Sequence, residues 1–586
     1  MSLENQEIPN QSEEGRCTFY NAKKKRHCRQ LLSPHIPYPF SLEPDFKPLY
    51  CGNHGSMYST LMKDRKRTKF QHDAQSKTND VSSNSRKKGK RIPCPVDPSH
   101  YIYESNVDAH VKKCPMAVKA NEEKSRGYYT ENINAGGCGH FLFEFGKEPF
   151  MKKESVKRSV DAKDLVLRIL GAYVKTFMKD RVEEFDNDDA LISSLTFEDM
   201  YNAIECHDLY QEEEEGMNSM VSKHRVKIGG PKHMRQIGSI VGHVRRNNLL
   251  DSSIVLEMGA GRATTGFAVA GVCASTKTFH PSKFLINDTL DRSGMVKLVV
   301  VEKGGSRSKA DAAFRRIQED AARAKNSDAD SDVAKIDGPS SSPLQDYFQP
   351  EYVDFHRIKC DLAHVSIPNA MKEVEKKSNS IPLCQEVSKS TMDQDRNILL
   401  IAKHLCGAGT DLALKSAEPI RDQVKGFVLA TCCHGICVWN LYVGRDFLGN
   451  IMCVKDNDVF GESEFNYLRK WATGTVIGDP NKTSSSGADE VMQESSEEET
   501  KDQEHKILLD DDTNFQIGVS QIAKQLNLKC GPEGLGRACQ RLIDFGRTQY
   551  MQKSLMTTQG STKLFHYVDK SVTPQNAMLL GINSNF

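Results

Sequence analysis

Four short apolar runs, separated by segments long enough to hold helices, constrain the fold of this chain more than any other feature. The runs are Ile254–Met258, Leu298–Glu302, Ile398–Ala402 and Phe427–Ala430. Short, continuous runs rich in Val, Ile and Leu are typical of strands buried on both faces of a parallel sheet. We therefore predict an α/β domain with a mostly parallel sheet over residues 250–586.

The length of 586 residues is too great for one domain. The spacing of apolar residues predicts an amphipathic helix over residues 161–185, and a basic helix over 231–249. Both lie in what we expect to be a helical connecting region. This connecting region spans residues 120–249, and a flexible basic linker precedes it over 64–91. Three insertions have too few apolar residues for a core, and they cover residues 303–346, 371–396 and 478–506.

Charge and cysteine content limit where the chain works and what it binds. Lys and Arg (79) balance Asp and Glu (78), which excludes a uniformly basic surface, so nucleic acid would be bound by local patches. No apolar run approaches the roughly 18 residues of a membrane span, and the N-terminal residues do not form a secretory signal. We expect an intracellular protein of the nucleus, the cytoplasm or both, without membrane contact, and with its 17 cysteines reduced. The sequence indicates no stable protein partner.

Four metal-binding side chains lie close together near the N-terminus, in the order Cys94, His100, His110 and Cys114. Their spacing, C-x5-H-x9-H-x3-C, suits a tetrahedral zinc site, and little else over residues 92–118 could hold a small domain together. We expect a helix to place His110 and Cys114 on one face, since they are four positions apart. The alternative is that the four residues bind no metal.

A looser cluster precedes this one, over residues 14–58. Its members are Cys17, Cys28, Cys51 and His54, spaced C-x10-C-x22-C-x2-H. Zinc would supply the folding energy that the short segment between them lacks, although three unrelated buried cysteines are the alternative. The basic runs KKKR and RKKGKR nearby suit phosphate contact, or equally a solvated face or an import signal.

The first predicted strand runs into a glycine turn, in the sequence SSIVLEMGAGRATTG. Glu257 is followed by Gly259 and Gly261, which let the backbone approach a ligand at the carboxyl end of the strand. The pattern lacks the third glycine of a dinucleotide-binding turn, which disfavours NAD. A turn that binds no ligand remains the alternative.

Several motifs of the large domain occur together in one known family. In chain order they are VLEMGAG, VVVEK, RIKCDL, IAKHLCGAGTDLAL, ATCCHGIC and RACQRLIDFGRTQYM. The segments YYTENINAG and PKHMRQIGSIVGH precede these motifs, and the two cysteine–histidine clusters come before both segments. Together, the motifs and segments resemble the tRNA 2′-O-methyltransferases that modify nucleotide 4 of the acceptor stem. The family usually reads CCHH followed by a basic residue, and this chain departs from it at Gly435 and Ile436.

The resemblance implies a Rossmann-like class I methyltransferase domain, two N-terminal zinc fingers of the CCCH and CHHC types, and tRNA as the partner. It also implies S-adenosylmethionine and two zinc ions as cofactors. Residues implied at the cofactor site are Glu257, Gly259 and Gly261, Glu302 for the ribose hydroxyls, and Asp361 beside the adenine.

Two predicted strands end in reactive side chains, which we expect at the catalytic edge of the sheet. We expect Lys403 to steer or deprotonate the attacking ribose hydroxyl, with His404 or His434 as the alternative base. The sequence supports a further zinc site from Cys406, Cys432, Cys433 and His434 less strongly than the two N-terminal sites, because adjacent cysteines on a strand point to opposite faces.

A C-terminal helix contains Arg537, Arg541 and Arg547, which either contact phosphates or, as we prefer, form the exposed face of a closing helix. Two other functions compete with RNA methylation. One is a non-catalytic RNA-binding or spliceosome-associated adaptor, which the altered CCHGIC segment favours. The other is an NAD-dependent oxidoreductase, which the missing glycine disfavours.

Overall fold

The protein was analysed as a computed structural model of the full chain. It describes residues 90–96, 100–136, 160–277, 295–304, 308–329, 347–379, 397–453, 459–473 and 518–584, together with short strands at 20–21, 26–27, 285–286, 289–290 and 508–509. The chain divides into two compact units, residues 1–92 with 101–105 and residues 93–100 with 106–586. In the first unit, β1 (Tyr20–Asn21) pairs with β2 (Arg26–His27). The predicted ligands Cys17, Cys28, Cys51 and His54 lie outside the described residues, so the CCCH zinc site stays a prediction.

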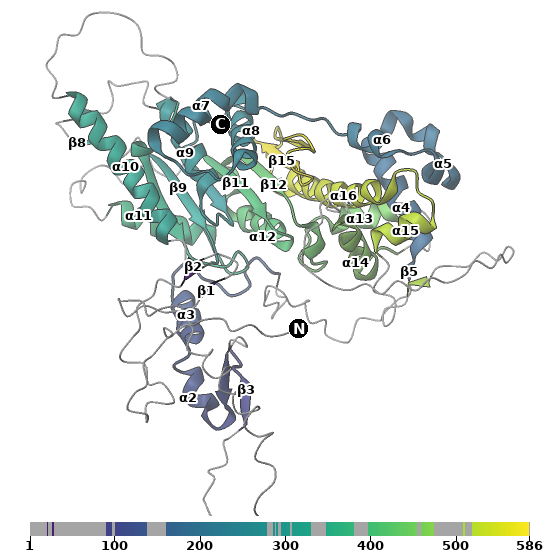
Figure 1. The fold of residues 1–586 in the computed structure, drawn as a ribbon, viewed down its shortest axis with the longest axis horizontal. Coiled ribbons are helices and arrows are strands. Elements are labelled where there is room, and N and C mark those ends of the chain that lie inside the picture. Colours follow the sequence, from purple (N-terminus) through teal and green to yellow (C-terminus); the bar gives the residue numbers. More distant parts are fainter. Residues whose placement is uncertain are drawn as a thin grey trace, which may run out of the picture. The chain divides into compact units, whose positions relative to one another are not determined.

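A seven-stranded sheet forms the centre of the larger unit (Figure 1). In spatial order its strands are β10 (Val353–Ile358), β9 (Val296–Val301), β6 (Ile254–Met258), β11 (Ile398–Leu405), β12 (Val424–Thr431), β15 (Ala577–Ile582) and β14 (Ser561–His566). The first five run parallel, and β15 is antiparallel to both neighbours. The predicted α/β class and the four predicted strands are confirmed.

The order of the strands shows where a ligand can bind. The chain leads from β6 outward to β9 and β10 and then returns to β11 on the other side of β6. At such a switch point, the carboxyl ends of the strands form the binding crevice of open α/β sheets. The antiparallel β15 lies between β12 and β14, so the strand order differs from the order 3-2-1-4-5-6 of dinucleotide-binding sheets. This arrangement agrees with a methyltransferase fold.

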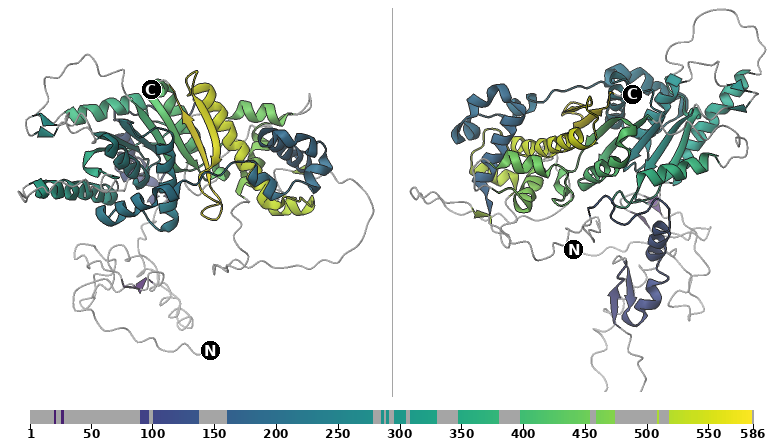
Figure 2. Two further views of the ribbon diagram at one scale, coloured as in Figure 1. Left: turned by 90° about the horizontal axis from the view of Figure 1, so that it is seen from above. Right: turned by 180° about the vertical axis from the view of Figure 1, so that it is seen from behind.

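Helices cover both faces of the sheet because successive strand residues point to opposite faces. One face, with Val255 and Leu399, packs against α8 (Pro231–Arg246) and α9 (Thr264–Lys277). The other, with Leu256 and Leu400, packs against α11 (Ile367–Asn379) and α12 (Ala408–Ala417). The predicted helix over 231–249 is therefore confirmed as α8. Figure 2 shows the yellow strands β14 and β15 beside the long helix α16 (Gly531–Ser554).

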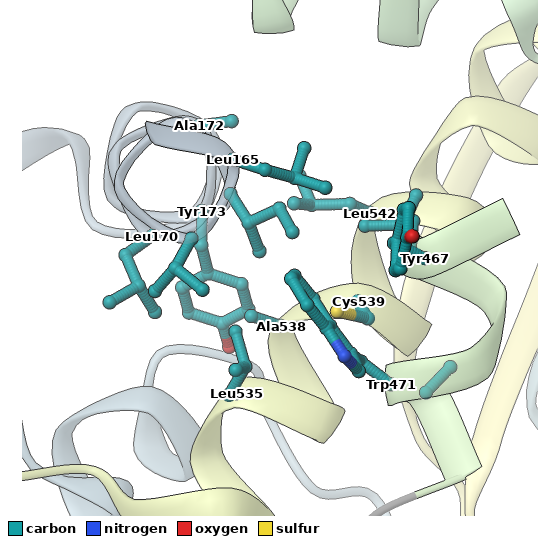
Figure 3. Packing of buried hydrophobic residues seen from close by; sticks show 14 of the residues in the cluster. Leu165, Leu170, Ala172, Tyr173, Tyr467, Trp471, Leu535, Ala538, Cys539 and Leu542 are labelled. Carbon is teal, nitrogen blue, oxygen red and sulfur yellow. The ribbon is translucent and has the colours of Figure 1, made fainter. Parts of the chain in front are cut away.

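A separate core lies between helices that are far apart in the sequence. Tyr173 of α4 (Ala162–Phe177) packs with Trp471 of α14 (Glu462–Trp471) and with Leu535 of α16 (Figure 3). The predicted amphipathic helix is confirmed as α4, and the side chain of Asp161 caps its N-terminus by accepting from the backbone N–H of Lys163 at 3.0 Å. The remaining helices of this unit are α2 (Val107–Val111), α3 (Pro115–Lys124), α5 (Asp188–Ser193), α6 (Phe197–Asn202), α7 (Tyr210–His224), α10 (Ser308–Ala329), α13 (Arg445–Met452) and α15 (Val519–Gln525).

Two of the predicted insertions are wrong in part, because each contains a packed helix. Phe314 of α10 stacks on Phe267 with ring centroids 4.3 Å apart, although residues 303–346 were expected to bury nothing. Similarly, α11 extends to Asn379 and buries Met371 and Val374. A few apolar residues on one helical face are enough for packing against an existing core. Among the described residues, no helix is long and apolar enough to cross a membrane.

Candidate active site

The turn after β6 exposes its backbone at the switch point of the sheet. Gly259 and Gly261 adopt φ angles of 63° and 50°, which suit glycine because a side chain is strained there. The N–H of Gly259 donates to the carbonyl of Val301 at 2.9 Å, so the turn is fixed against β9. A Cβ atom at Gly261 would meet nothing within 4 Å, which leaves this position open to a ligand.

Glu257 is buried at the end of β6, with a side chain that the protein only partly satisfies. Burial raises its pKa to about 8, against the opposing effects of the Gly266 N–H and of the charges on Arg357 and Lys403. Its Oε2 atom is buried and accepts no hydrogen bond within the described residues. Buried polar atoms almost always have partners, so this carboxylate oxygen is available to a polar ligand that reaches the turn.

Glu302 and Arg357 hold the glycine turn in place. The two oxygens of Glu302, at the end of β9, accept from the N–H groups of Gly261 at 2.7 Å and Gly304 at 2.8 Å. Arg357 of β10 donates to the carbonyl of Gly261 at 3.3 Å and forms a bidentate pair with Asp311 of α10. An ionised carboxylate has about four acceptor sites, so Glu302 can still accept ligand hydroxyls.

Asp361 follows β10 and is held by neighbours on both sides. Its carboxylate pairs with Lys303 at 2.7 Å and accepts from the N–H of Ala363 at 2.9 Å. Burial alone would raise its pKa, but Lys303 and these hydrogen bonds keep the pKa below its usual value. Asp361 is therefore ionised and fixed beside the end of β9, where Lys303 follows Glu302.

Lys403 lies near the end of β11, on the strand adjacent to that of Glu257. Burial lowers its pKa to about 8, although the charge on Glu257 acts in the opposite direction. Within the described part of the chain its ammonium group makes no hydrogen bond or ion pair. Burial also lowers the pKa of His233 of α8, and the charge on Lys403 lowers it further, so His233 lies near the same site. The side chain of His404 lies outside the described residues.

The structure places His434 in a buried ion-pair cluster. Its Nε2 atom lies 2.9 Å from Oδ1 of Asp544, and its side chain is 1% exposed. Burial would raise the pKa of Asp544, but His434, Arg547 and Arg541 lower it to about 2. All the nitrogens of the Arg547 guanidinium donate to protein oxygens, among them both carboxylate oxygens of Asp411.

Both expectations for the arginines of α16 are therefore wrong. Arg537, Arg541 and Arg547 are at most 1% exposed, so they neither contact phosphates nor form an exposed face. Sequence reasoning also missed Arg357 and Asp311, which position the glycine turn, and His233 near Lys403. Arg357 lies within the RIKCDL motif, but its partner is 46 residues away in the sequence and no local pattern joins them.

The four predicted ligands of the CHHC cluster lie close together, although no single helix places them there. The Nε2 atoms of His100 and His110 lie 2.9 Å apart, and the Sγ atoms of Cys94 and Cys114 lie 4.0 Å apart. The expected helix joining His110 and Cys114 is wrong: α2 ends at Val111, and Cys114 instead occupies the N-cap position of α3. The turn between the two helices brings the four side chains together.

Comparisons with known proteins agree with this geometry. The sequence model described as "Methyltransferase TRM13" matches residues 235–582, more than half of the chain. The chain belongs to the TRM13 methyltransferase family. The U11-48K-like CHHC zinc finger model matches residues 91–115, which confirms the CHHC finger. The family identified from sequence motifs is thus confirmed as well.

Relatives named as TRM13 enzymes align with this chain, two of them along nearly its whole length. The human "tRNA:m(4)X modification enzyme TRM13 homolog" is 22% identical over 97% of this chain and 95% of its own length. The TRM13 enzyme of Saccharomyces cerevisiae is 22% identical over 97% of this chain and 96% of its own. The rice enzyme is 26% identical over 42% of this chain and 80% of its own. No solved structure matches the chain.

Proposed function

We propose that this TRM13-family methyltransferase transfers a methyl group from S-adenosylmethionine to the 2′-hydroxyl of nucleotide 4 in the acceptor stem of tRNA. The names of the relatives supply tRNA and position 4. The observation that carries the chemistry is that two incompletely bonded groups, the buried Glu257 and the half-buried Lys403, lie on adjacent strands at the switch point of the sheet. Ionisable groups with strongly shifted pKa values are typical of sites that bind a ligand or perform catalysis.

The residues around the glycine turn fit this cofactor. The open space beside Gly261 would admit the cofactor and the orphaned oxygen of Glu257 would bind one of its polar groups, while Glu302 and Asp361 offer carboxylates for its ribose and base. When bound, S-adenosylmethionine supplies an electrophilic methyl group on a positively charged sulfur. A cation at this turn favours the ionised form of Glu257, which the protein alone disfavours.

Lys403 is the residue that we assign to the ribose hydroxyl. A pKa near 8 leaves a useful fraction of neutral amine at physiological pH, which can accept the hydroxyl proton as the new bond forms. When charged, the same group stabilises a developing alkoxide. His434 is less suited, because its side chain is 1% exposed and paired with Asp544. His404 remains the alternative base.

The CHHC finger, with the CCCH finger predicted before it, would assist tRNA binding and hold two zinc ions in all. A-form RNA presents its 2′-hydroxyls in a wide, shallow groove, which is recognised by shape and backbone charge. The competing function is a non-catalytic RNA-binding adaptor, favoured by the departure at Gly435 and Ile436. In the structure, the carbonyl of Gly435 accepts from Arg469 at 2.7 Å, and a Cβ atom there would lie 2.6 Å from a methyl carbon of Thr473. Gly435 is therefore built into a tight contact.

The test is transfer of radiolabelled methyl groups from S-adenosylmethionine to total tRNA, followed by nucleoside analysis. We expect label in a 2′-O-methylated nucleoside of the acceptor stem. Lys403→Met should lower kcat about 10²- to 10⁴-fold and remove the limb of the pH profile near pH 8. Lys524→Met, at an exposed position of α15, should change neither.

Lys403→Arg separates the two roles of the lysine. Arginine keeps the positive charge but cannot act as a base near neutral pH. Activity retained in Lys403→Arg would assign charge stabilisation, whereas loss in both variants supports proton transfer. Normal activity of Lys403→Met, with loss in His404→Gln, would move the base to His404. No methyl transfer by a protein that still binds tRNA and cofactor would instead establish the adaptor.

A further inference from the structure

Three cysteine sulfurs meet where β11 and β12 end, outside both zinc fingers. Cys406 directly follows β11, and Cys432 and Cys433 follow β12. The Sγ atom of Cys406 lies 3.6 Å from that of Cys432 and 3.2 Å from that of Cys433, and all three lie within 4.8 Å of one another. Cys432 is buried, Cys406 is half-buried and Cys433 is exposed.

The objection that adjacent cysteines point to opposite faces does not apply here. That alternation holds within a strand, but β12 ends at Thr431. Beyond it the chain turns into a short 3₁₀ helix, His434–Ile436, and β11 has an irregular register between Lys403 and Leu405. Both cysteine segments are therefore loops, and their geometry lets three sulfurs face one point.

The CHHC finger of the same structure provides a reference for the spacing of zinc ligands. Its ligand atoms are separated by 2.9 Å, 3.9 Å and 4.0 Å. Tetrahedral zinc with Zn–S bonds of about 2.3 Å requires sulfurs about 3.8 Å apart. The separations of 3.2 Å and 3.6 Å in the cysteine trio fall in the same range, so one ion can contact all three sulfurs after small adjustments.

The loops that carry the trio are also anchored to one rigid support. Gly407, next to Cys406, accepts from Arg547 at 3.0 Å. On the other loop, Thr431 donates to Asp544 at 2.9 Å and His434 lies 2.9 Å from Asp544, so residues on both sides of Cys432 and Cys433 are fixed. Arg547 and Asp544 are themselves paired at 3.2 Å. Such neighbours hold ligands in place before metal arrives.

We propose that Cys406, Cys432 and Cys433 bind a third zinc ion through their thiolates. Soft sulfur ligands in a tetrahedral arrangement favour zinc, and the three cysteines leave its fourth position for solvent or another ligand. The exposed Cys433 provides the entry path. The ion would tie Cys406, three residues after Lys403, to the cysteines that follow β12.

Metal analysis of the full-length protein, purified with zinc under reducing conditions, tests the proposal. Cys433→Ser and Cys406→Ser should each lower the zinc content by one equivalent per chain relative to the natural sequence. Cys206→Ser, at an exposed cysteine outside both ligand clusters found among the described residues, should lower it by none. Cys114→Ser should remove a different ion, so Cys114→Ser combined with Cys433→Ser should remove two.

A second measurement keeps the proposal falsifiable if Cys406→Ser folds poorly. Cobalt replacing zinc gives a thiolate-to-metal charge-transfer band, and this band should weaken in Cys433→Ser but not in Cys206→Ser. Unchanged zinc content and an unchanged cobalt band in Cys433→Ser would overturn the proposal. A disulfide between Cys406 and Cys433 in the protein as purified, seen as a mass two hydrogens lighter, would overturn it as well.

Discussion

Two groups of buried or half-buried charges lie at the carboxyl edge of the same sheet and differ in whether their charges are ion-paired. In the first, Glu257 has a carboxylate oxygen without a partner, and Lys403 has no hydrogen bond or ion pair in the described part of the chain. In the second, which we call the arginine cluster, Arg547 donates from all its nitrogens and pairs with both Asp411 and Asp544. Atoms without a hydrogen bond occur in both groups, since Nδ1 of His434 and Nη1 of Arg541 also have none. What marks the first group as a site for a ligand is that, among the described residues, neither Glu257 nor Lys403 forms an ion pair, whereas Asp411, Asp544 and Arg547 are paired with one another.

The same difference decides which protonation states the fold prefers. Burial outweighs the opposing charges, raising the pKa of Glu257 to about 8 and lowering that of Lys403 to about 8, so the fold shifts both groups toward their neutral forms. Within the arginine cluster, His434, Arg547 and Arg541 overcome the effect of burial and lower the pKa of Asp544 to about 2. The charges of the first group would be stabilised by a charged ligand, whereas those of the arginine cluster already stabilise one another.

The largest effect is expected from breaking the arginine cluster. Arg547→Met leaves Asp411 and Asp544 buried without their main cation, which should lower the free energy of unfolding by about 3–5 kcal/mol. Urea unfolding followed by circular dichroism measures it. The matched control is Lys553→Met on the same helix, whose pair with Asp446 is 79% and 89% exposed and should contribute at most about 0.5 kcal/mol. A loss below about 1 kcal/mol in Arg547→Met would show that the cluster is not a structural support.

The sequence predicted the parts of the site that local pattern encodes. Continuous apolar runs identified β6, β9, β11 and β12, and the glycine turn after Glu257 followed from residues adjacent in the chain. It did not predict the arginine cluster, because an amphipathic pattern assumes that arginine faces solvent. Arg547 is 136 residues from Asp411, and only the assembled fold provides that partner.

The same limit explains the missed helices of the insertions and the cysteine trio. Phe314 and Ile317 are the large apolar residues of an otherwise polar helix, and Phe314 is buried because Phe267 lies opposite it. The three sulfurs come from two strands whose ends meet only when the sheet forms. Composition and periodicity report the average character of a segment, whereas these contacts depend on single residues placed by distant parts of the chain.

A smaller effect, of opposite sign, is expected at Glu257. Because its folded pKa lies above the unfolded value, its stabilising contribution is complete below about pH 4.5 and is lost as the pH rises to about 8. Glu257→Gln removes this loss and should raise the free energy of unfolding at pH 8 by about 2 kcal/mol, with little change at pH 4.5. The same variant should lose the increase in Tm that S-adenosylmethionine gives.

An exposed glutamate provides the control for Glu257, because solvent already stabilises its charge. Glu215→Gln on α7, at an exposed position, should change neither stability nor the response to cofactor. If Glu257→Gln were destabilising at pH 8 and kept its cofactor response, the carboxylate would belong with the arginine cluster as a structural group. The contrast between the two groups would then fail.

The smallest effect is expected at Asp311, whose pair with Arg357 lies between the two extremes. Arg357 and Asp311 have side chains 5% and 14% exposed, and Arg357 also holds the carbonyl of Gly261. Asp311→Asn keeps the shape and weakens the pair, so the glycine turn should lose part of its support while the sheet stays intact. We expect S-adenosylmethionine to bind about 3- to 10-fold more weakly by calorimetry, which corresponds to about 1 kcal/mol. Asp320→Asn on the same helix, whose side chain is 73% exposed, should bind normally. Equal affinities in both variants would show that the turn is held by Glu302 alone, and that partial burial of this pair serves packing rather than the cofactor.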